Sequence, residues 1–272
     1  MGHSPAVILA AYNIKGGVGK TSAAVNLAYL AARGGASTLL WDLDPQGAST
    51  YLLRVKPKVK GGGRRLVIGR TDPDARIKGT DYEGLDLLPA DFSYRHMDIH
   101  LDSAKRPRRQ LARVLEPLEA EYEYVFLDCP PSISLASESV FEAADALLIP
   151  LLPAELSARP LDRIEEVAGP GLRLFAFFSM VDSRKRMHRD VMERFVAERP
   201  EMLHTVVPLA ADIERMGQAR APLEEFAPRT RAAAAFRELW EEIRERLAGA
   251  PPGMDARRNG PTDAERSEAN EP

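Results

Sequence analysis

The chain has 272 residues, of which 44% are hydrophobic and 28% charged, and its formal net charge is −3. This size allows a substantial core and lies near the upper limit for one domain, and the low net charge means that any surface for nucleic acid must be a local basic patch. The single cysteine, Cys129, excludes a disulfide framework and a multi-cysteine metal or iron–sulfur site within one chain, so we expect a reducing, cytoplasmic setting. No apolar stretch approaches the roughly 20 residues that span a bilayer, and the N-terminus lacks the features of a signal peptide.

Short apolar runs alternate with helical patterns along the chain. The expected strands are Ala6–Tyr12, Ser37–Trp41, Leu85–Leu88, Tyr124–Leu127, Ala146–Ile149, Leu172–Phe178 and Thr205–Val207. The expected helices are Thr21–Arg33, Pro107–Ala120, Leu135–Ala143, Leu161–Val167, Arg189–Glu198 and Arg231–Leu247. Continuously apolar strands separated by helices are typical of a parallel sheet covered on both faces. The pattern therefore predicts a doubly wound α/β fold with a mostly parallel sheet.

Two segments interrupt this alternation. Residues 54–71 contain seven basic residues and no acidic one, with three consecutive glycines, and we expect an exposed, partly stranded excursion that adds DNA contacts or a partner site. Residues 249–272 are rich in proline, glycine and charge without apolar periodicity, so a disordered tail is expected. The remaining 1–248 are expected to form one domain.

A glycine-rich segment, NIKGGVGKT at 13–21, lies between the first expected strand and the first expected helix. It matches the phosphate-loop pattern G-x-x-x-x-G-K-[ST] except that Ile14 occupies the first glycine position. Glycines let successive backbone N–H groups face one anion, and a helix N-terminus adds partial positive charge. In such a loop Lys20 would neutralise the β- and γ-phosphates and the Thr21 hydroxyl would bind Mg²⁺. The plainer alternative is a glycine-rich turn.

The stretch KGGVGKT resembles the deviant Walker A motif of the ParA/MinD family of ATPases, which have the P-loop NTPase type of fold. Lys15 matches the signature lysine of that family, and the resemblance implies that it reaches the nucleotide of a partner subunit in an ATP-dependent homodimer. The residues that would bind ATP are Lys15, Gly16, Gly17, Val18, Gly19, Lys20, Thr21 and Ser22, with Pro208 near the adenine. The structural alternative for Lys15 is a solvated loop lysine.

Two carboxylate segments follow later strands. DLDPQG at 42–47 resembles the family's switch I, which implies that Asp44 orients the attacking water and meets Mg²⁺ through water, while Asp42 supports the loop or the metal-bound water. YVFLDCPPS at 124–132 resembles switch II, so Asp128 would hold a Mg²⁺-bound water. Lys15, Lys20 and Asp44 are the expected catalytic residues. Each segment alone also fits an ordinary strand-end turn, and Cys129 fits a small buried side chain better than a nucleophile.

Basic residues gather in two later segments, and ParA-type dimers bind DNA without sequence preference through such residues. The resemblance suggests a DNA-binding patch made of Arg184, Lys185, Arg186, Arg189, Arg215 and Arg220. An ordinary solvated helix face is the alternative. The implied function is a partner-stimulated ATPase that dimerises on ATP, binds the nucleoid and positions a plasmid, chromosome region or protein complex, with a ParB-like protein or cargo adaptor as activator.

Other functions fit the residues less well. A MinD-like membrane ATPase would need a basic amphipathic C-terminal helix, whereas the expected helix at 231–247 carries a mixed-charge face and an apolar stripe suited to covering the core, so no membrane partner is expected. An ATP-dependent amidoligase of the same superfamily remains the competing enzyme class. Nitrogenase-iron-protein relatives need two cysteines per subunit. His96 and His100 share a helical face, but Met97 stands where a zinc hydrolase motif needs glutamate.

Overall fold

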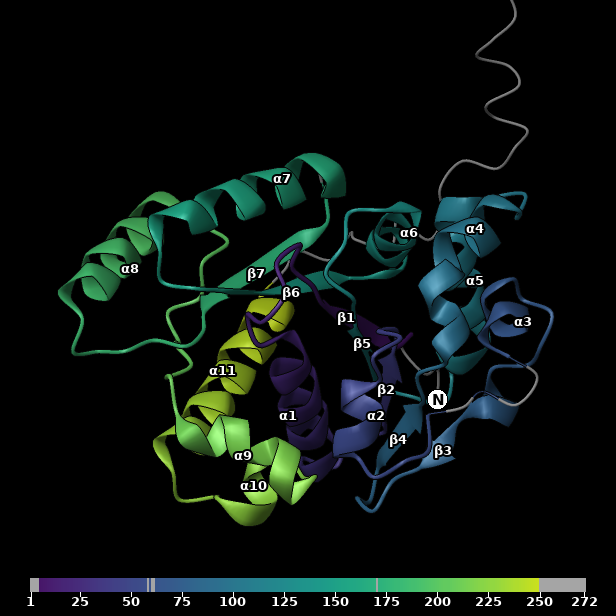
Figure 1. Ribbon diagram of the computed structural model, residues 1–272, viewed down its shortest axis with the longest axis horizontal. Coiled ribbons are helices and arrows are strands. Elements are labelled where there is room, and N and C mark those ends of the chain that lie inside the picture. Colours follow the sequence, from purple (N-terminus) through teal and green to yellow (C-terminus); the bar gives the residue numbers. More distant parts are fainter. Residues whose placement is uncertain (1–4, 58, 60–61, 170, 250–272) are drawn as a thin grey trace, which may run out of the picture.

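The computed structural model describes residues 5–57, 59, 62–169 and 171–249. Within them one sheet of seven strands has the order β3-β4-β2-β5-β1-β6-β7, and all neighbours are parallel except β3 and β4 (Figure 1). The strands are β1 Val7–Ala11, β2 Thr38–Asp42, β3 Lys78–Gly79, β4 Leu85–Leu88, β5 Tyr124–Asp128, β6 Ala146–Leu151 and β7 Arg173–Phe178. The predicted doubly wound, mostly parallel α/β fold is confirmed.

Helices cover both faces of this sheet (Figure 1). They are α1 Lys20–Arg33, α2 Ala48–Leu52, α3 Gly63–Val67, α4 Met97–Asp102, α5 Gln110–Leu115, α6 Leu135–Ala143, α7 Ala158–Ala168, α8 Arg186–Glu198, α9 Ala211–Ala219, α10 Leu223–Phe226 and α11 Arg231–Ala248. Short 3₁₀ turns occur at Asp74–Arg76, Phe92–His96, Pro107–Arg109, Glu116–Leu118 and Glu155–Ser157.

Two hydrophobic cores flank the sheet, because successive side chains of a strand point to opposite faces. In β1, Ile8 and Ala10 join the core that contains side chains of α3 to α8, whereas Leu9 joins the core with α1, α9, α10 and α11. The same alternation places Val125 and Phe126 of β5 in different cores. The central strands are therefore buried on both sides, as their unbroken apolar sequences require.

The last helix, α11, covers the core as its apolar stripe predicts. Phe236, Leu239, Trp240 and Ile243 are all buried in it. Among the described residues, no helix combines the length and the apolar character needed to cross a membrane.

Two of the expected elements do not form as predicted. The expected strand at Thr205–Val207 is wrong, since this segment forms no strand and isolated bridges occur only on either side of it, at Met202 with Ala176 and at Pro208 with Val181. The amides of His204 and Thr205 bind the Glu242 carboxylate instead. The expected continuous helix Pro107–Ala120 is also wrong, since α5 is flanked by 3₁₀ turns. Pro117 has no amide hydrogen to bind a carbonyl of the preceding turn, which ends the regular helix.

The basic segment 54–71 folds differently from the expected exposed, partly stranded excursion. It contains helix α3 and no strand within its described residues, and Val59, Leu66 and Val67 are buried in the core. Its described basic side chains are exposed, namely Arg54, Lys56, Arg64, Arg65 and Arg70. Lys58 and Lys60 lie outside the described residues, as does the predicted tail beyond Gly249.

Candidate nucleotide-binding site

The functional segments meet at one edge of the sheet because the central strands end in register. Ala11 at the end of β1 pairs with Asp128 of β5, and Asp128 pairs with Asp42 of β2. In open parallel sheets, ligands bind at the carboxyl ends of the strands, where the connecting loops converge. The predicted phosphate loop and both carboxylate segments are thus brought together.

The phosphate loop connects β1 to α1 and is anchored by Asn13. The buried Asn13 side chain donates from Nδ2 to the Pro150 carbonyl at 2.8 Å and accepts the Lys15 amide at 2.9 Å. Gly17 and Gly19 have φ values of 71° and 100°, a region that glycine adopts without strain. Helix α1 has no side-chain cap at Gly19, so the N–H groups of its first turn remain available for an anion.

Replacing Gly19 by alanine is expected to destabilise the protein by about 1–3 kcal/mol. A Cβ there would lie 2.9 Å from the Ser179 Oγ and would have to adopt the strained φ of 100°. Gly16→Ala is the matched control, since its Cβ would meet nothing closer than a Pro131 carbon at 4.0 Å. Chemical denaturation of both variants without nucleotide measures the difference, and equal stability would contradict this description of the loop.

The two lysines of the loop have different surroundings. Lys20 is only 7% exposed, and its Nζ donates to the Lys15 carbonyl at 3.0 Å. Burial lowers the pKa of Lys20, while the neighbouring Asp128 raises it. Lys15 is exposed, and among the described residues its Nζ reaches only the Leu156 carbonyl at 3.5 Å, the outer limit of a hydrogen bond. Lys20 is therefore committed to the loop of its own chain, whereas the Lys15 ammonium faces outward.

The carboxylates of Asp42 and Asp128 are fully buried and held by helix α2. Ser49 donates its hydroxyl to Asp128 Oδ2 at 2.7 Å, and Thr50 donates to Asp42 Oδ2 from its amide at 2.8 Å and its hydroxyl at 2.7 Å. Asp128 Oδ1 has no hydrogen-bond partner among the described residues. A buried oxygen without a donor fits a Mg²⁺-bound water. Burial raises the pKa of Asp128, and the hydroxyls of Ser49 and Thr21 oppose that shift, which places Thr21 near the carboxylate.

Both buried carboxyls should make the nucleotide-free protein less stable as the pH rises. Burial raises the pKa of each, and the neighbouring Asp128 raises that of Asp42 further, although hydroxyl hydrogen bonds oppose the shifts. Each group then binds a proton more tightly in the folded chain than in the unfolded one. The free energy of unfolding therefore falls as the pH rises from the usual carboxyl value of about 4 through the raised values.

The isosteric change Asp128→Asn removes one of these groups and should flatten that fall. At pH 8 the nucleotide-free variant should be more stable by about 1 kcal/mol, which corresponds to a Tm increase of about 2–4 °C. Thermal unfolding between pH 4 and 8 measures the effect. If the Tm of both proteins changed with pH in the same way, burial of the Asp128 carboxylate would not be the cause of the pH dependence.

Asp44 lies partly buried at the start of the loop after β2. Its Oδ1 accepts the Gln46 amide at 2.9 Å, which closes a small turn, and its own amide donates to Asp42 Oδ1 at 3.3 Å. The side chain is thus oriented by its own loop, with carboxylate lone pairs left for a water. Cys129, next to the site, is buried, and burial raises the pKa of its thiol well above the ordinary value, which suits the predicted structural role and not a nucleophile.

Pro208, predicted to lie near an adenine, lines a small and mostly apolar cavity of about 70 Å³. The loop residues Gly19 and Ser22 line the same cavity, and Phe177 and Ile213 close it. A flat, apolar base fits such a wall beside the phosphate loop. The geometry therefore brings Pro208 and the loop together at one site.

Sequence reasoning missed the support residues Asn13, Ser49 and Thr50. A usable signal was present, since Ser49 and Thr50 are small hydroxyl residues directly after the segment DLDPQGA, where they follow two strand-end carboxylates. Ser49 binds Asp128 79 positions later and Asn13 binds Pro150 137 positions later, so these two contacts become visible only in the folded chain.

The six predicted DNA-contact residues fall into two groups. Arg184, Lys185, Arg186 and Arg189 are exposed where the β7–α8 loop enters α8, whereas Arg215 and Arg220 belong to α9 and its end. Carboxylates accompany three of them: Arg184 pairs with Asp182, Arg186 with Asp190 and Arg215 with Asp212. Arg189 donates to the Ser183 carbonyl at 2.7 Å, and the Arg220 side chain lies against Tyr51.

The histidine pair lies where a 3₁₀ turn meets α4. His96 ends a 3₁₀ turn and His100 lies in α4, and their ring centroids are 6.4 Å apart. In the part of the chain that the structure describes, no group of three or more histidine, cysteine, aspartate or glutamate side chains is arranged to hold a metal ion.

Comparisons with known proteins agree with this geometry. A family model described as an AAA domain matches residues 6–168. The chain is 31% identical over 195 residues to the chromosome partitioning protein ParA of Myxococcus xanthus, covering 68% of this chain and 69% of that one. The chain belongs to the ParA/MinD family of deviant Walker A ATPases. It is also 29% identical over 246 residues to the sporulation initiation inhibitor protein Soj of Bacillus subtilis, covering 87% of this chain and 97% of the relative.

A solved structure of another ParA/MinD-like fold is cobyrinic acid a,c-diamide synthase from Mycobacterium smegmatis, which was crystallised with a bound ATP analogue and magnesium. It superposes with a TM-score of 0.74 at 26% identity and covers 90% of this chain and 96% of its own. Family membership confirms the predicted deviant Walker A ATPase family and its P-loop type of fold, and the roles of Lys15 and the other loop residues stay predictions.

Proposed function

We propose that this chain is a partitioning ATPase that binds ATP and Mg²⁺, dimerises around the nucleotide and hydrolyses it to reset a cargo-positioning cycle. The observation that carries the proposal is the contrast between the two loop lysines. Lys20 is buried against its own loop, while Lys15, five residues earlier, is exposed with only a 3.5 Å contact to the Leu156 carbonyl. A second cation that faces away from its own cradle suits a phosphate in an opposing subunit.

The residues divide the chemistry among them. Lys20 and the loop amides bind the β- and γ-phosphates, and Pro208 lies against the base. Thr21 and, through a water, Asp128 would hold Mg²⁺, and a bound metal would supply positive charge beside the phosphates. Asp44 positions the attacking water, and Lys15 of the partner subunit stabilises the transferred group. Because one subunit lacks this last cation, its intrinsic hydrolysis should be slow.

Static light scattering of the full chain tests this function. With Mg²⁺ and a non-hydrolysable ATP analogue the chain should approach twice its mass of 30.0 kDa, and with ADP or without nucleotide it should remain a monomer. A mass that does not depend on the nucleotide, despite measured nucleotide binding, would contradict the proposal.

The dimer is proposed to bind DNA without sequence preference, through basic side chains doubled by dimerisation. Reversing the charge at Arg189 should weaken affinity about tenfold and reduce the dependence on salt concentration, because phosphate contacts release bound counterions. Arg244→Glu on α11 is the matched control, since Arg244 is also an exposed helical arginine and is paired with Glu241. Fluorescence anisotropy over a salt series measures both, and an unchanged slope for Arg189→Glu would remove this residue from the surface.

An ATP-dependent amidoligase is the second candidate, favoured by the 26% identity with cobyrinic acid a,c-diamide synthase. Both functions use the same nucleotide site and differ in what accelerates hydrolysis. An amidoligase should hydrolyse ATP in step with consumption of a carboxylic acid and a nitrogen donor, whereas a partitioning ATPase should respond to DNA and an activating protein. Hydrolysis measured with each addition separates the two candidates.

A further inference from the structure

Three described residues other than glycine have a positive φ, and two of them face each other. Arg54 follows α2 with a φ of 59°, and Arg220 ends α9 with a φ of 50°. A side chain in this region is strained by about 1 kcal/mol or more, and such strain persists only where surrounding contacts hold it. Here the contacts connect the two strained residues to each other.

The connection is reciprocal. Arg54 donates from Nε to the Arg220 carbonyl at 3.0 Å and from Nη2 to the Ala219 carbonyl at 3.3 Å. Arg220 donates from Nε to the Tyr51 carbonyl at 3.1 Å, and its guanidinium carbon lies 4.5 Å from the centre of the Tyr51 ring. We call this arrangement of Arg54, Arg220 and Tyr51 the arginine clasp. It fastens the end of α2 to the end of α9, 165 to 169 residues later in the chain.

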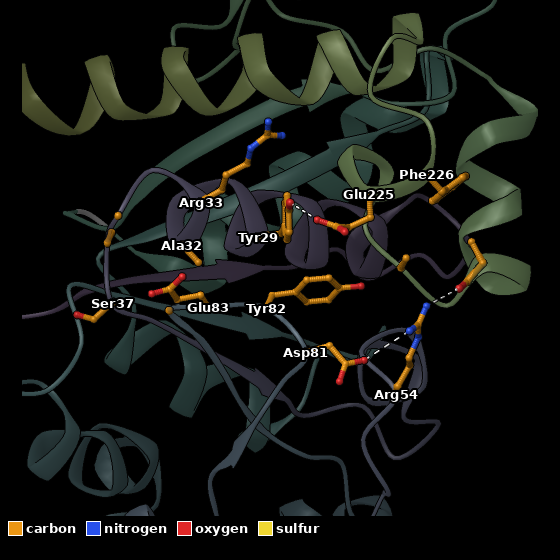
Figure 2. A pocket seen from close by; sticks show the side chains of 15 residues that line it. Tyr29, Ala32, Arg33, Ser37, Arg54, Asp81, Tyr82, Glu83, Glu225 and Phe226 are labelled. Carbon is orange, nitrogen blue, oxygen red and sulfur yellow. Dashed lines mark hydrogen bonds and ion pairs between the residues drawn. The ribbon is translucent and has the colours of Figure 1, made fainter.

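The clasp also borders a cavity of about 1020 Å³, into which Arg54 projects (Figure 2). There Arg54 Nη1 lies 3.5 Å from the Asp81 carboxylate, so all three of its nitrogens have partners. These three contacts restrict the orientation of the Arg54 guanidinium, which allows it to connect α2 and α9.

The opposite end of α2 is bound to the nucleotide site. Ser49 donates to Asp128 and Thr50 donates to Asp42, and all four side chains are buried. Helix α2 has only five residues, so the hydroxyl contacts and the clasp lie within two turns of each other. Any displacement of Asp128 or Asp42 would therefore be passed to α2, and through the clasp to α9.

We propose that α2 and the arginine clasp couple the nucleotide site to α9, which carries Arg215, and that Arg54 is a positioning residue of this link. The inference rests on the proposed function, since it requires nucleotide at the phosphate loop. In this proposal Arg220 has a structural role within its own chain, because its guanidinium contacts Tyr51.

Hydrogen–deuterium exchange of the full chain tests the link, followed in peptides that cover residues 211–222. In the wild-type chain, Mg²⁺ and a non-hydrolysable ATP analogue should slow exchange there severalfold relative to the nucleotide-free chain. In Arg54→Gly that response should disappear while nucleotide affinity stays within about threefold, because Arg54 does not touch the nucleotide site. Glycine adopts the φ of residue 54 without strain, so the variant should still fold. Arg54→Lys keeps the positive charge but lacks the several N–H donors of a guanidinium, so it should give a reduced response.

Two controls separate the outcomes. Arg33→Ala removes another arginine that lines the same cavity and pairs with Glu224, and it should keep the wild-type response (Figure 2). Lys15→Ala should also keep it, because the link lies within one chain and does not need the dimer. Nucleotide binding without any change at 211–222, or a full response in Arg54→Gly, overturns the link alone. Absence of nucleotide binding in the wild-type chain overturns the proposed function as well.

Discussion

Replacing Lys15 by alanine should weaken ATP-dependent dimerisation about 30-fold or more while nucleotide affinity of the monomer stays within about threefold. The Lys15 ammonium is exposed and reaches no phosphate-loop group of its own chain, so the monomer site keeps Lys20, the loop amides and Thr21. A cation that meets a phosphate across an interface commonly contributes 2 kcal/mol or more, which corresponds to about 30-fold in affinity. The loss should therefore appear in dimerisation alone.

Sedimentation velocity with a non-hydrolysable ATP analogue measures dimerisation, and a fluorescent nucleotide measures monomer affinity. Lys78→Ala is the control, since Lys78 is an exposed lysine on β3, at the far edge of the sheet order from β6 and β7. Unchanged dimerisation of Lys15→Ala, or an equal loss of monomer binding, would assign Lys15 to its own chain.

Replacing Asp44 by alanine should have the opposite effect, slowing hydrolysis about 100-fold or more while the ATP-bound dimer persists. The Asp44 carboxylate is oriented by the Gln46 amide and lies beside the buried Asp42, where it can hold a water against the γ-phosphate. Neither the phosphate cradle nor the outward-facing Lys15 depends on it. The dimer should then accumulate because its disassembly requires hydrolysis.

Phosphate release in single turnover and light scattering in ATP itself separate the two effects. Asp44→Asn keeps the size and the turn-forming acceptor without the charge, so it should retain the loop geometry and lose the rate. If either variant hydrolysed ATP at the wild-type rate, the water-positioning role would belong to another residue.

The sequence predicted the parts of this protein whose causes are local. Continuous apolar strands predicted the parallel sheet, and a glycine loop between strand and helix predicted the phosphate cradle, since both patterns follow from backbone requirements of neighbouring residues. The positions of Asp42 and Asp128 at strand ends placed them at one edge of the sheet, and the register then brought them into adjacent pairing.

The unpredicted features depend on partners that are distant in the chain. Thr205 reads as a strand residue, but its amide binds Glu242 on α11, and no local pattern reveals that competition. Ser49 reads as an ordinary helix residue until Asp128 is placed beside it, 79 positions later. The basic segment 54–71 was predicted to be exposed from its charge, yet the buried Leu66 and Val67 show that its apolar residues decide its packing.

Hydrolysis by a mixture of the Lys15→Ala and Asp44→Ala chains tests the central claim most directly, which is that each subunit completes the other's nucleotide site. In a mixed dimer the Lys15→Ala chain keeps its own Asp44 and receives Lys15 from its partner, so one site is whole. The account predicts that the mixture regains a substantial fraction of wild-type hydrolysis although each variant alone is nearly inactive. A mixture that hydrolyses ATP no faster than the sum of its parts would show that Lys15 acts within its own chain and would contradict the account.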